Sequence, residues 1–222
     1  MRKNMRKVCL CASFFTCIVV GACAQANNLT TIQQGIKRCT EKIAHFSGLE
    51  TERLLIRNFD EHDIDDVFVF TSDPYIVELT SIFDLMQTRD EAKLYVESMI
   101  QYSRNGIPCY WAIQEKATGK VIGLICIDIQ SRTRGDLGYV VARDYWGRGI
   151  ATEATKAVID FGFKVLDLKR IEALCDPRNI ASARVLEKCG MGYEGLLKSY
   201  YCVHGVMCDR KLYAITAENY EL

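Results

Sequence analysis

The sequence lacks the features that would mark a metal site, a nucleic-acid partner or a repeat protein. Its 28 basic and 28 acidic residues give no formal net charge, so composition provides no argument for binding nucleic acid or an anionic membrane surface. The three histidines are scattered, and no CxxC pair or Cys/His cluster has zinc spacing. No internal repeat or low-complexity tract is present. We therefore expect neither a metal cofactor nor a nucleic-acid partner.

What is present suits one globular domain behind an unusual leader. The 222 residues are 49% hydrophobic and 25% charged, which is enough for a sizeable core. Four basic residues within 1–7 precede an uncharged, mostly apolar run over 8–24, the layout of a secretory signal. Residues 20–23 resemble a lipoprotein cleavage box that would place a lipid on Cys23. The run is short for a membrane span, and a mis-assigned start codon or a loosely held apolar extension is the other explanation.

Cysteine is abundant, with 11 residues in the chain. Outside the leader the number is odd, and most of these residues fall inside predicted strands or helices. This pattern favours buried free thiols over a disulfide framework. It indicates a reducing compartment and a cytoplasmic location for the folded domain, with membrane association through residues 8–24 as the alternative. The cysteines concerned are Cys39, Cys109, Cys126, Cys175, Cys189, Cys202 and Cys208.

The clearest pattern for a ligand site is a strand, a glycine-bearing turn and a helix. Residues 139–141 favour a strand, and helical apolar spacing begins at Ala151. Between them, Gly147 and Gly149 flank Arg148. Such a turn leaves backbone N–H groups unpaired at a helix N-terminus, where the helix dipole also suits a phosphate. The spacing fits neither a Walker A loop nor GxGxxG, and a plain connection in an α/β domain is the alternative.

This turn resembles the acetyl-CoA-binding signature of the GNAT N-acetyltransferase superfamily, Gln/Arg-x-x-Gly-x-Gly/Ala. Gly149 and Ala151 fit the signature, whereas Trp146 departs from it. A bulky residue there is familiar in the branch that includes the Rim-type ribosomal-protein N-acetyltransferases. The resemblance runs in the family's order over roughly residues 50 to 216. Its other parts are the opening strand at 52–57, the central hairpin at 111–123 and the Asn-x-x-Ser helix segment at 179–191.

The resemblance implies an α+β chain with the GNAT acyl-CoA N-acyltransferase fold, a central mixed and mostly antiparallel sheet with helices on both faces. We expect a leader over 1–24, a linker or accessory helix over 25–50, the GNAT domain over 51–217 and a tail over 218–222. Residue patterns predict helices over 30–46, 60–71, 88–104, 149–166 and 179–188, with a break at Asp73-Pro74. They predict strands over 53–59, 109–116, 120–129, 135–142, 170–175, 192–199 and 206–216.

The function implied by the resemblance is acetyl-CoA-dependent transfer of an acetyl group, by direct attack, to a primary amine. The acceptor would be a protein N-terminus, a polyamine or a small-molecule amine, contacted by residues within 75–86, and the enzyme a monomer or homodimer. A non-catalytic acyl-CoA-binding module and an exported lipoprotein with a repurposed fold are the alternatives.

The same resemblance implies where acetyl-CoA, as co-substrate, would bind. The turn would hold its pyrophosphate through backbone amides, and its pantetheine arm would insert where the strand at 139–142 splays from the strand after residue 170. A backbone N–H near Val140 or Val141 would polarise the thioester carbonyl. The predicted binding residues are Val140, Val141, Trp146, Gly147, Arg148, Gly149, Ile150, Ala151, Thr152 and Asn179.

Proton transfer is the less defined part of the predicted site. Many relatives carry a tyrosine that protonates the leaving thiolate, and Leu186 stands at that position here. Ser182, a water or the pair Tyr200/Tyr201 would replace it, or the thiolate would leave into solvent. Asn179 is a further candidate, near the pantetheine arm in the family and otherwise a simple helix N-cap.

For the general base the sequence offers three carboxylates. Asp136 is the first choice because the family often places a carboxylate before this strand. Glu115 and Asp128 are alternatives, and a water chain to bulk solvent would serve the same purpose. Each carboxylate is otherwise an ordinary solvated group at a strand edge.

Overall fold

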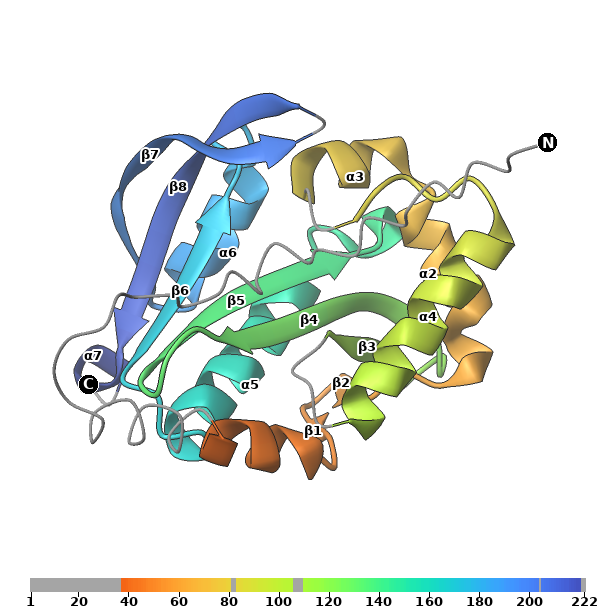
Figure 1. Cartoon of the computed structure of the whole chain (residues 1–222), viewed down its shortest axis with the longest axis horizontal. Coiled ribbons are helices and arrows are strands. Elements are labelled where there is room, and N and C mark those ends of the chain that lie inside the picture. Colours follow the sequence, from red (N-terminus) through yellow and green to blue (C-terminus); the bar gives the residue numbers. More distant parts are fainter. Residues whose placement is uncertain (1–36, 81–82, 106–109, 204, 221–222) are drawn as a thin grey trace, which may run out of the picture.

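A computed structural model describes residues 37–80, 83–105, 110–203 and 205–220 (Figure 1). The predicted leader, Cys109 and the first part of the helix predicted over 30–46 lie outside these residues. The strands are β1 (Leu49–Glu50), β2 (Leu54–Arg57), β3 (Trp111–Glu115), β4 (Val121–Ile129), β5 (Arg134–Val141), β6 (Arg170–Cys175), β7 (Gly192–Val203) and β8 (Val206–Thr216). The helices are η2 (Glu61–Asp63), α2 (Ile64–Thr71), α3 (Pro74–Thr80), α4 (Arg89–Arg104), η3 (Arg143–Tyr145), α5 (Ile150–Lys164), α6 (Ile180–Lys188) and α7 (Ala217–Tyr220).

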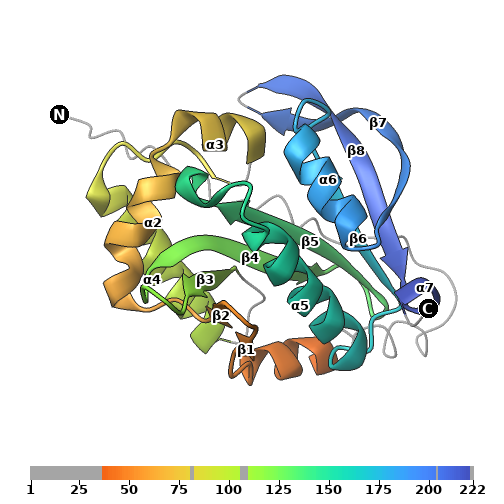
Figure 2. The same ribbon diagram turned by 180° about the vertical axis from the view of Figure 1, so that it is seen from behind.

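One eight-stranded sheet runs through the domain in the order β1-β2-β3-β4-β5-β6-β8-β7. Among the described strands, only β5 and β6 pair in parallel, and every other neighbouring pair is antiparallel. Helices α2 and α4 lie over one face, and α5 and α6 lie over the other (Figures 1 and 2). A hydrophobic core fills the space on each face. The predicted mixed, mostly antiparallel sheet with helices on both faces is therefore confirmed.

Capping residues decide where several of these helices begin. Thr88 accepts a hydrogen bond from the backbone N–H of Glu91, whose carboxylate accepts from the N–H of Thr88 in return. This is the predicted capping box. Asp60 caps in the same manner, although the first turn after it is the 3₁₀ helix η2. Asn179 caps α6 as predicted.

Four short elements are absent from the prediction, namely η3, α7, α3 and β1. The predicted break at Asp73-Pro74 is present, but α3 begins there, because proline is well tolerated in the first turn of a helix. Strand β1 adds an edge to the sheet by pairing with β2.

Residues 37–44 are helical, and Phe46 after them stacks on Trp111 with ring centroids 4.3 Å apart. The described residues that precede β1 therefore help to form the core.

The cysteine thiols that the structure describes are all free. Cys39, Cys126, Cys175 and Cys189 are buried, while Cys202 is exposed and Cys208 is half-buried, both on the β7–β8 hairpin. Buried thiols were expected, and the hairpin pair is the exception. Among the described helices, none has the length and apolar character needed to cross a membrane.

Candidate functional site

The glycine turn opens α5 without a side-chain cap. Gly149 is the N-cap residue, in the left-handed region at φ 78°, and Gly147 has φ 74°. The first bond of the helix runs from the N–H of Glu153 to the carbonyl of Gly149. The N–H groups of residues 150–152 therefore point out of the first turn without an intrahelical acceptor. A Cβ built on Gly147 would meet no atom within 4 Å, so the space beside this turn is open.

A brace from the β1–β2 turn holds this helix start in place. Arg53 Nη1 donates to the carbonyl oxygen of Arg148 at 2.8 Å, and Arg53 Nε donates to Glu153 Oε2 at 2.6 Å. Thr51 Oγ1 donates to Glu153 Oε1 at 2.5 Å. Burial opposes ionisation of Glu153, but these bonds outweigh it and lower its pKa. The brace thus neutralises the one acidic side chain in the first turn of α5.

This brace escaped the sequence analysis. Arg53 and Glu153 are 100 residues apart, and each looks like an ordinary exposed charge in its own element. The available signal was the charge pattern itself: a carboxylate at a proposed anion-binding helix start requires a cation close by.

The sheet opens next to the turn, between β5 and β6. Their parallel ladder ends at Leu137↔Ala173, although β5 continues to Val141 and remains paired with β4 to the end. The N–H of Ala142 donates to the carbonyl of Ile122 on β4 at 2.8 Å. Because backbone direction alternates along a strand, the N–H of Val140 also faces β4, and that of Val141 faces away from it toward the β6 side. Of the two predicted valines, Val141 therefore presents its N–H to the opening.

Trp146 contacts the last residue of this strand. Its indole Nε1 donates to the carbonyl oxygen of Val141 at 2.7 Å, while its ring stays 40% exposed. The same turn places Arg148 over the ring of Tyr145, 5.2 Å from the centroid. The indole thus ties the glycine turn to β5, a bond that gives the bulky residue at position 146 a structural role.

The start of α6 faces β5 across the opening. Asn179 Oδ1 accepts the backbone N–H of Ser182 at 2.9 Å, the geometry of the N-cap alternative. The Ser182 hydroxyl lies 2.9 Å from the hydroxyl of Tyr139 on β5. Leu186, one turn further, is 1% exposed. The side chain of Tyr139 was not predicted as part of the site; a lone tyrosine next to two valines in the strand was its only signal.

Asp136 lies on β5, on the face opposite Tyr139, because side chains alternate along a strand. It is in register with Asp128 on β4 and Glu172 on β6. Burial raises its pKa to about 6, Arg134 opposes the rise, and the two neighbouring carboxylates add to it. Within the described part of the chain its Oδ1 has no hydrogen-bond partner. Asp136 is thus a partly desolvated carboxylate that titrates close to neutral pH.

The other predicted proton-transfer candidates have different surroundings. Asp128 accepts from Gln130 Nε2 at 2.9 Å, and burial raises its pKa. Glu115 lies on β3, separated from β5 by β4, and accepts from Thr118 in the hairpin turn. Tyr200 is 53% exposed on β7. Arg210 lies over the ring of Tyr201.

Helix α3 approaches both sides of the opening. Arg143, just after β5, bonds to Asp73 at 2.6 Å and lies 5.0 Å from the ring centroid of Tyr75. Arg178, just before α6, bonds to Glu78 at 3.0 Å. The predicted acceptor segment 75–86 thus begins with a helix tied to both edges of the opening; its residues 81–82 are outside the described ranges.

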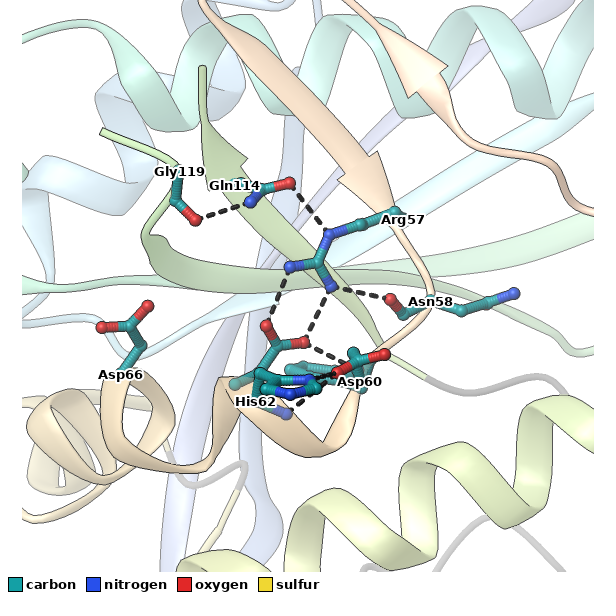
Figure 3. Close-up of a pocket in the computed structure, with 9 residues that line it drawn as sticks. Arg57, Asn58, Asp60, His62, Asp66, Gln114 and Gly119 are labelled. Atoms are coloured by element: carbon teal, nitrogen blue, oxygen red, sulfur yellow. Dashed lines mark hydrogen bonds and ion pairs between the residues drawn. The ribbon is translucent and has the colours of Figure 1, made fainter. Parts of the chain in front are cut away.

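A separate open groove lies at the end of β2, away from the glycine turn. Figure 3 shows Arg57 in this groove, with Gln114 beside its guanidinium. The two terminal nitrogens of Arg57, Nη1 and Nη2, each donate to a carboxylate oxygen of Asp63 at 2.8 Å. Arg57 Nε donates to Gln114. These charges neutralise each other and hold η2 against β2 and β3. In the described ranges, no three His, Cys, Asp or Glu side chains are grouped so as to hold a metal ion.

Comparisons with known proteins agree with this geometry. The family model for the acetyltransferase (GNAT) domain matches residues 53–192. An uncharacterised N-acetyltransferase, p20 of Bacillus licheniformis, is 32% identical over 78% of this chain and 97% of its own length. The crystal structure of a GNAT-family acetyltransferase from Bacillus anthracis is 29% identical, with a TM-score of 0.69, and covers 77% of this chain and 99% of that one.

A more distant structure shares the fold. RimL, a ribosomal L7/L12 alpha-N-protein acetyltransferase in complex with coenzyme A, is 18% identical with a TM-score of 0.64, over 76% of this chain and 97% of its own. The chain belongs to the GNAT acetyltransferase family, and it is an N-acetyltransferase. The family resemblance and the fold predicted from it are both confirmed.

Proposed function

We propose that this enzyme takes the acetyl group from acetyl-CoA and transfers it by direct attack to a primary amine. The observation that carries the proposal is the uncapped, glycine-bearing start of α5 beside the point where the β5–β6 ladder ends. Backbone N–H groups at such a helix start suit a pyrophosphate. Strand edges without a ladder partner suit an extended amide-containing arm such as pantetheine. The coenzyme A named with RimL supports this assignment.

In this proposal each residue has a limited task. The amides of residues 147–152 hold the pyrophosphate, and the Val141 N–H binds the thioester oxygen as negative charge develops on it. The acceptor enters from the face that carries Asp136, which takes a proton from the amine directly or through water. A carboxylate with a pKa of about 6 is ionised at pH 7 and is still basic enough for this role.

The acceptor class is a primary amine of a protein N-terminus, a polyamine or a small molecule. RimL acts on a protein N-terminus according to its name, which supports including peptides in the search. The acceptor would lie beside α3, where Tyr75 is 49% exposed and Arg143 and Trp146 flank it.

The test uses acetyl-CoA with an isotopically labelled acetyl group and a panel of N-terminal peptides, polyamines and small amines. We expect a labelled amide on at least one acceptor, with an equal amount of free coenzyme A. Binding of acetyl-CoA without transfer to any acceptor would favour the alternative of a non-catalytic acyl-CoA-binding module. No binding at all would refute the assignment of acetyl-CoA.

A further inference from the structure

Two hydroxyl groups connect the separated sides of the β5–β6 opening. Tyr139 extends from β5 beyond the last β5–β6 pair, and its hydroxyl lies 2.9 Å from Ser182 Oγ in the first turn of α6. The same hydroxyl lies 3.3 Å from the Ser182 carbonyl oxygen. Both residues are partly buried, so this contact is shielded from competing water.

The 2.9 Å contact allows either hydroxyl to donate. The surroundings of Tyr139 keep its own proton in place for that donation. Burial raises the pKa of Tyr139 far above the range of physiological pH, so its phenol keeps its proton. The titratable groups around it are Cys175 at the end of β6 and Cys189 after α6. Burial raises the pKa of each thiol to about 11, so both stay uncharged. Within the described residues, the Tyr139 hydroxyl contacts two acceptors, both of them oxygens of Ser182.

Once Tyr139 donates to Ser182 Oγ, the proton of the serine hydroxyl is left for a different acceptor. Asn179 holds the backbone N–H of Ser182, which fixes the first turn of α6. Leu186, one turn later, has no proton to donate. An alcohol that accepts a hydrogen bond becomes a better donor through its own proton.

We propose that Tyr139 is a positioning residue that directs the Ser182 hydroxyl toward the sulfur of coenzyme A. This inference rests on the proposed acetyl transfer. As the amine nitrogen bonds to the thioester carbon, the carbon–sulfur bond breaks and its electron pair stays on sulfur. The proton lost by the nitrogen goes to the general base. Ser182 stabilises the thiolate with a hydrogen bond and keeps its own proton; the thiolate takes a proton from water after release.

The test compares the affinity of coenzyme A with that of desulfo-coenzyme A, which lacks the sulfur, by calorimetry between about pH 7 and about pH 10. The proteins are wild type, Tyr139→Phe, Ser182→Ala and the control Tyr213→Phe. The control also removes a tyrosine hydroxyl bonded to α6, at Glu187 Oε1 3.2 Å away. Affinity for desulfo-coenzyme A reports that each variant keeps a folded binding site.

In wild type, coenzyme A should gain affinity over desulfo-coenzyme A as its thiol ionises. Ser182→Ala should reduce this gain about tenfold, the value of one hydrogen bond to a charged group. Tyr139→Phe should reduce it by roughly threefold through the lost polarisation, and Tyr213→Phe should leave it unchanged. If Tyr139→Phe keeps the full gain, the inference is overturned and the proposed function stands. If wild type binds neither ligand, both are overturned.

Discussion

At the scale of single residues, the proposed reaction depends on groups whose burial sets their proton affinity. Asp136 and Tyr139 lie three residues apart on β5 and on opposite faces of the sheet. Burial raises both pKa values, which makes the carboxylate a base near neutral pH and keeps the phenol protonated. In the proposed reaction, one strand thus carries a proton acceptor on the side of the amine and a hydrogen-bond donor on the side of the thiolate.

The pH dependence of the reaction tests the role of Asp136. Activity should rise as pH increases through about 6, because the base works only when ionised. Asp136→Asn should remove this rising limb of the pH–activity profile and reduce kcat by roughly 100-fold, the usual contribution of a general base. Asp128→Asn should keep the activity and shift the limb to lower pH, because the Asp128 charge helps to raise the pKa of Asp136. The measurement is kcat/KM against pH; an unchanged limb in Asp136→Asn would rule out this base.

Asp136→Asn should also change stability, with a sign set by the raised pKa. A carboxyl whose pKa is higher in the folded state binds its proton more tightly there, so folding is favoured at low pH. That contribution is lost as pH rises from about 4 to about 6. The variant should therefore exceed wild type in unfolding free energy by on the order of 2 kcal/mol at pH 7 and match it near pH 4. Urea unfolding at both pH values measures the difference; a less stable variant at pH 7 would contradict it.

The contacts of single residues were the part of the structure that the sequence predicted least well. Residue type and resemblance placed Asp136, Asn179 and Ser182 in the site, and their roles stay predictions. The Tyr139–Ser182 and Arg53–Glu153 contacts were missed because they join positions 43 and 100 residues apart. Such contacts depend on how elements pack, and local periodicity carries no information about that.

At the scale of elements, the glycine turn and α5 form the part of the site with the clearest physical basis. Gly147 and Gly149 are left-handed, and α5 begins at Gly149 without a side-chain cap, so the N–H groups of its first turn face open space. Arg53 holds the Arg148 carbonyl in place next to them. Helices and strands here were predictable because amphipathic spacing and caps are local. The short helix α3 was missed because Asp73-Pro74 indicates a break as readily as a helix start.

Gly147→Ala and Gly205→Ala form a matched pair for testing this turn. Both glycines have positive φ, 74° and 82°, and a Cβ on either meets nothing within 4 Å. Each substitution should cost roughly 1–2 kcal/mol of stability through backbone strain. Only Gly147→Ala should raise the KM for acetyl-CoA, by about tenfold, because its methyl group occupies the space of the anion. Equal KM values in the two variants would place the pyrophosphate elsewhere.

At the scale of the whole molecule, the proposed function places the two substrates on opposite sides of the sheet. Helices α5 and α6 cover one face of the sheet (Figure 2). Asp136 lies on the face opposite Tyr139, because side chains alternate along β5. Mixed pairing makes this possible, since the one parallel pair, β5–β6, is the place where the ladder ends early. The fold was predictable as a whole because the motifs occur in family order. The strand at 139–142 was expected to splay from the strand after residue 170, but the residue pair at which the ladder ends was not predicted, because strand pairing depends on register across the sheet.

The most direct test of the account compares acetyl-CoA with S-acetylpantetheine, which has the same thioester and arm but no pyrophosphate. Both donors are measured with one accepted amine, in wild type and in Gly147→Ala. The account predicts that wild type prefers acetyl-CoA by about tenfold or more in kcat/KM, from the charge-assisted bonds at the start of α5, and that Gly147→Ala loses most of this preference. Equal kcat/KM for the two donors in wild type would contradict it.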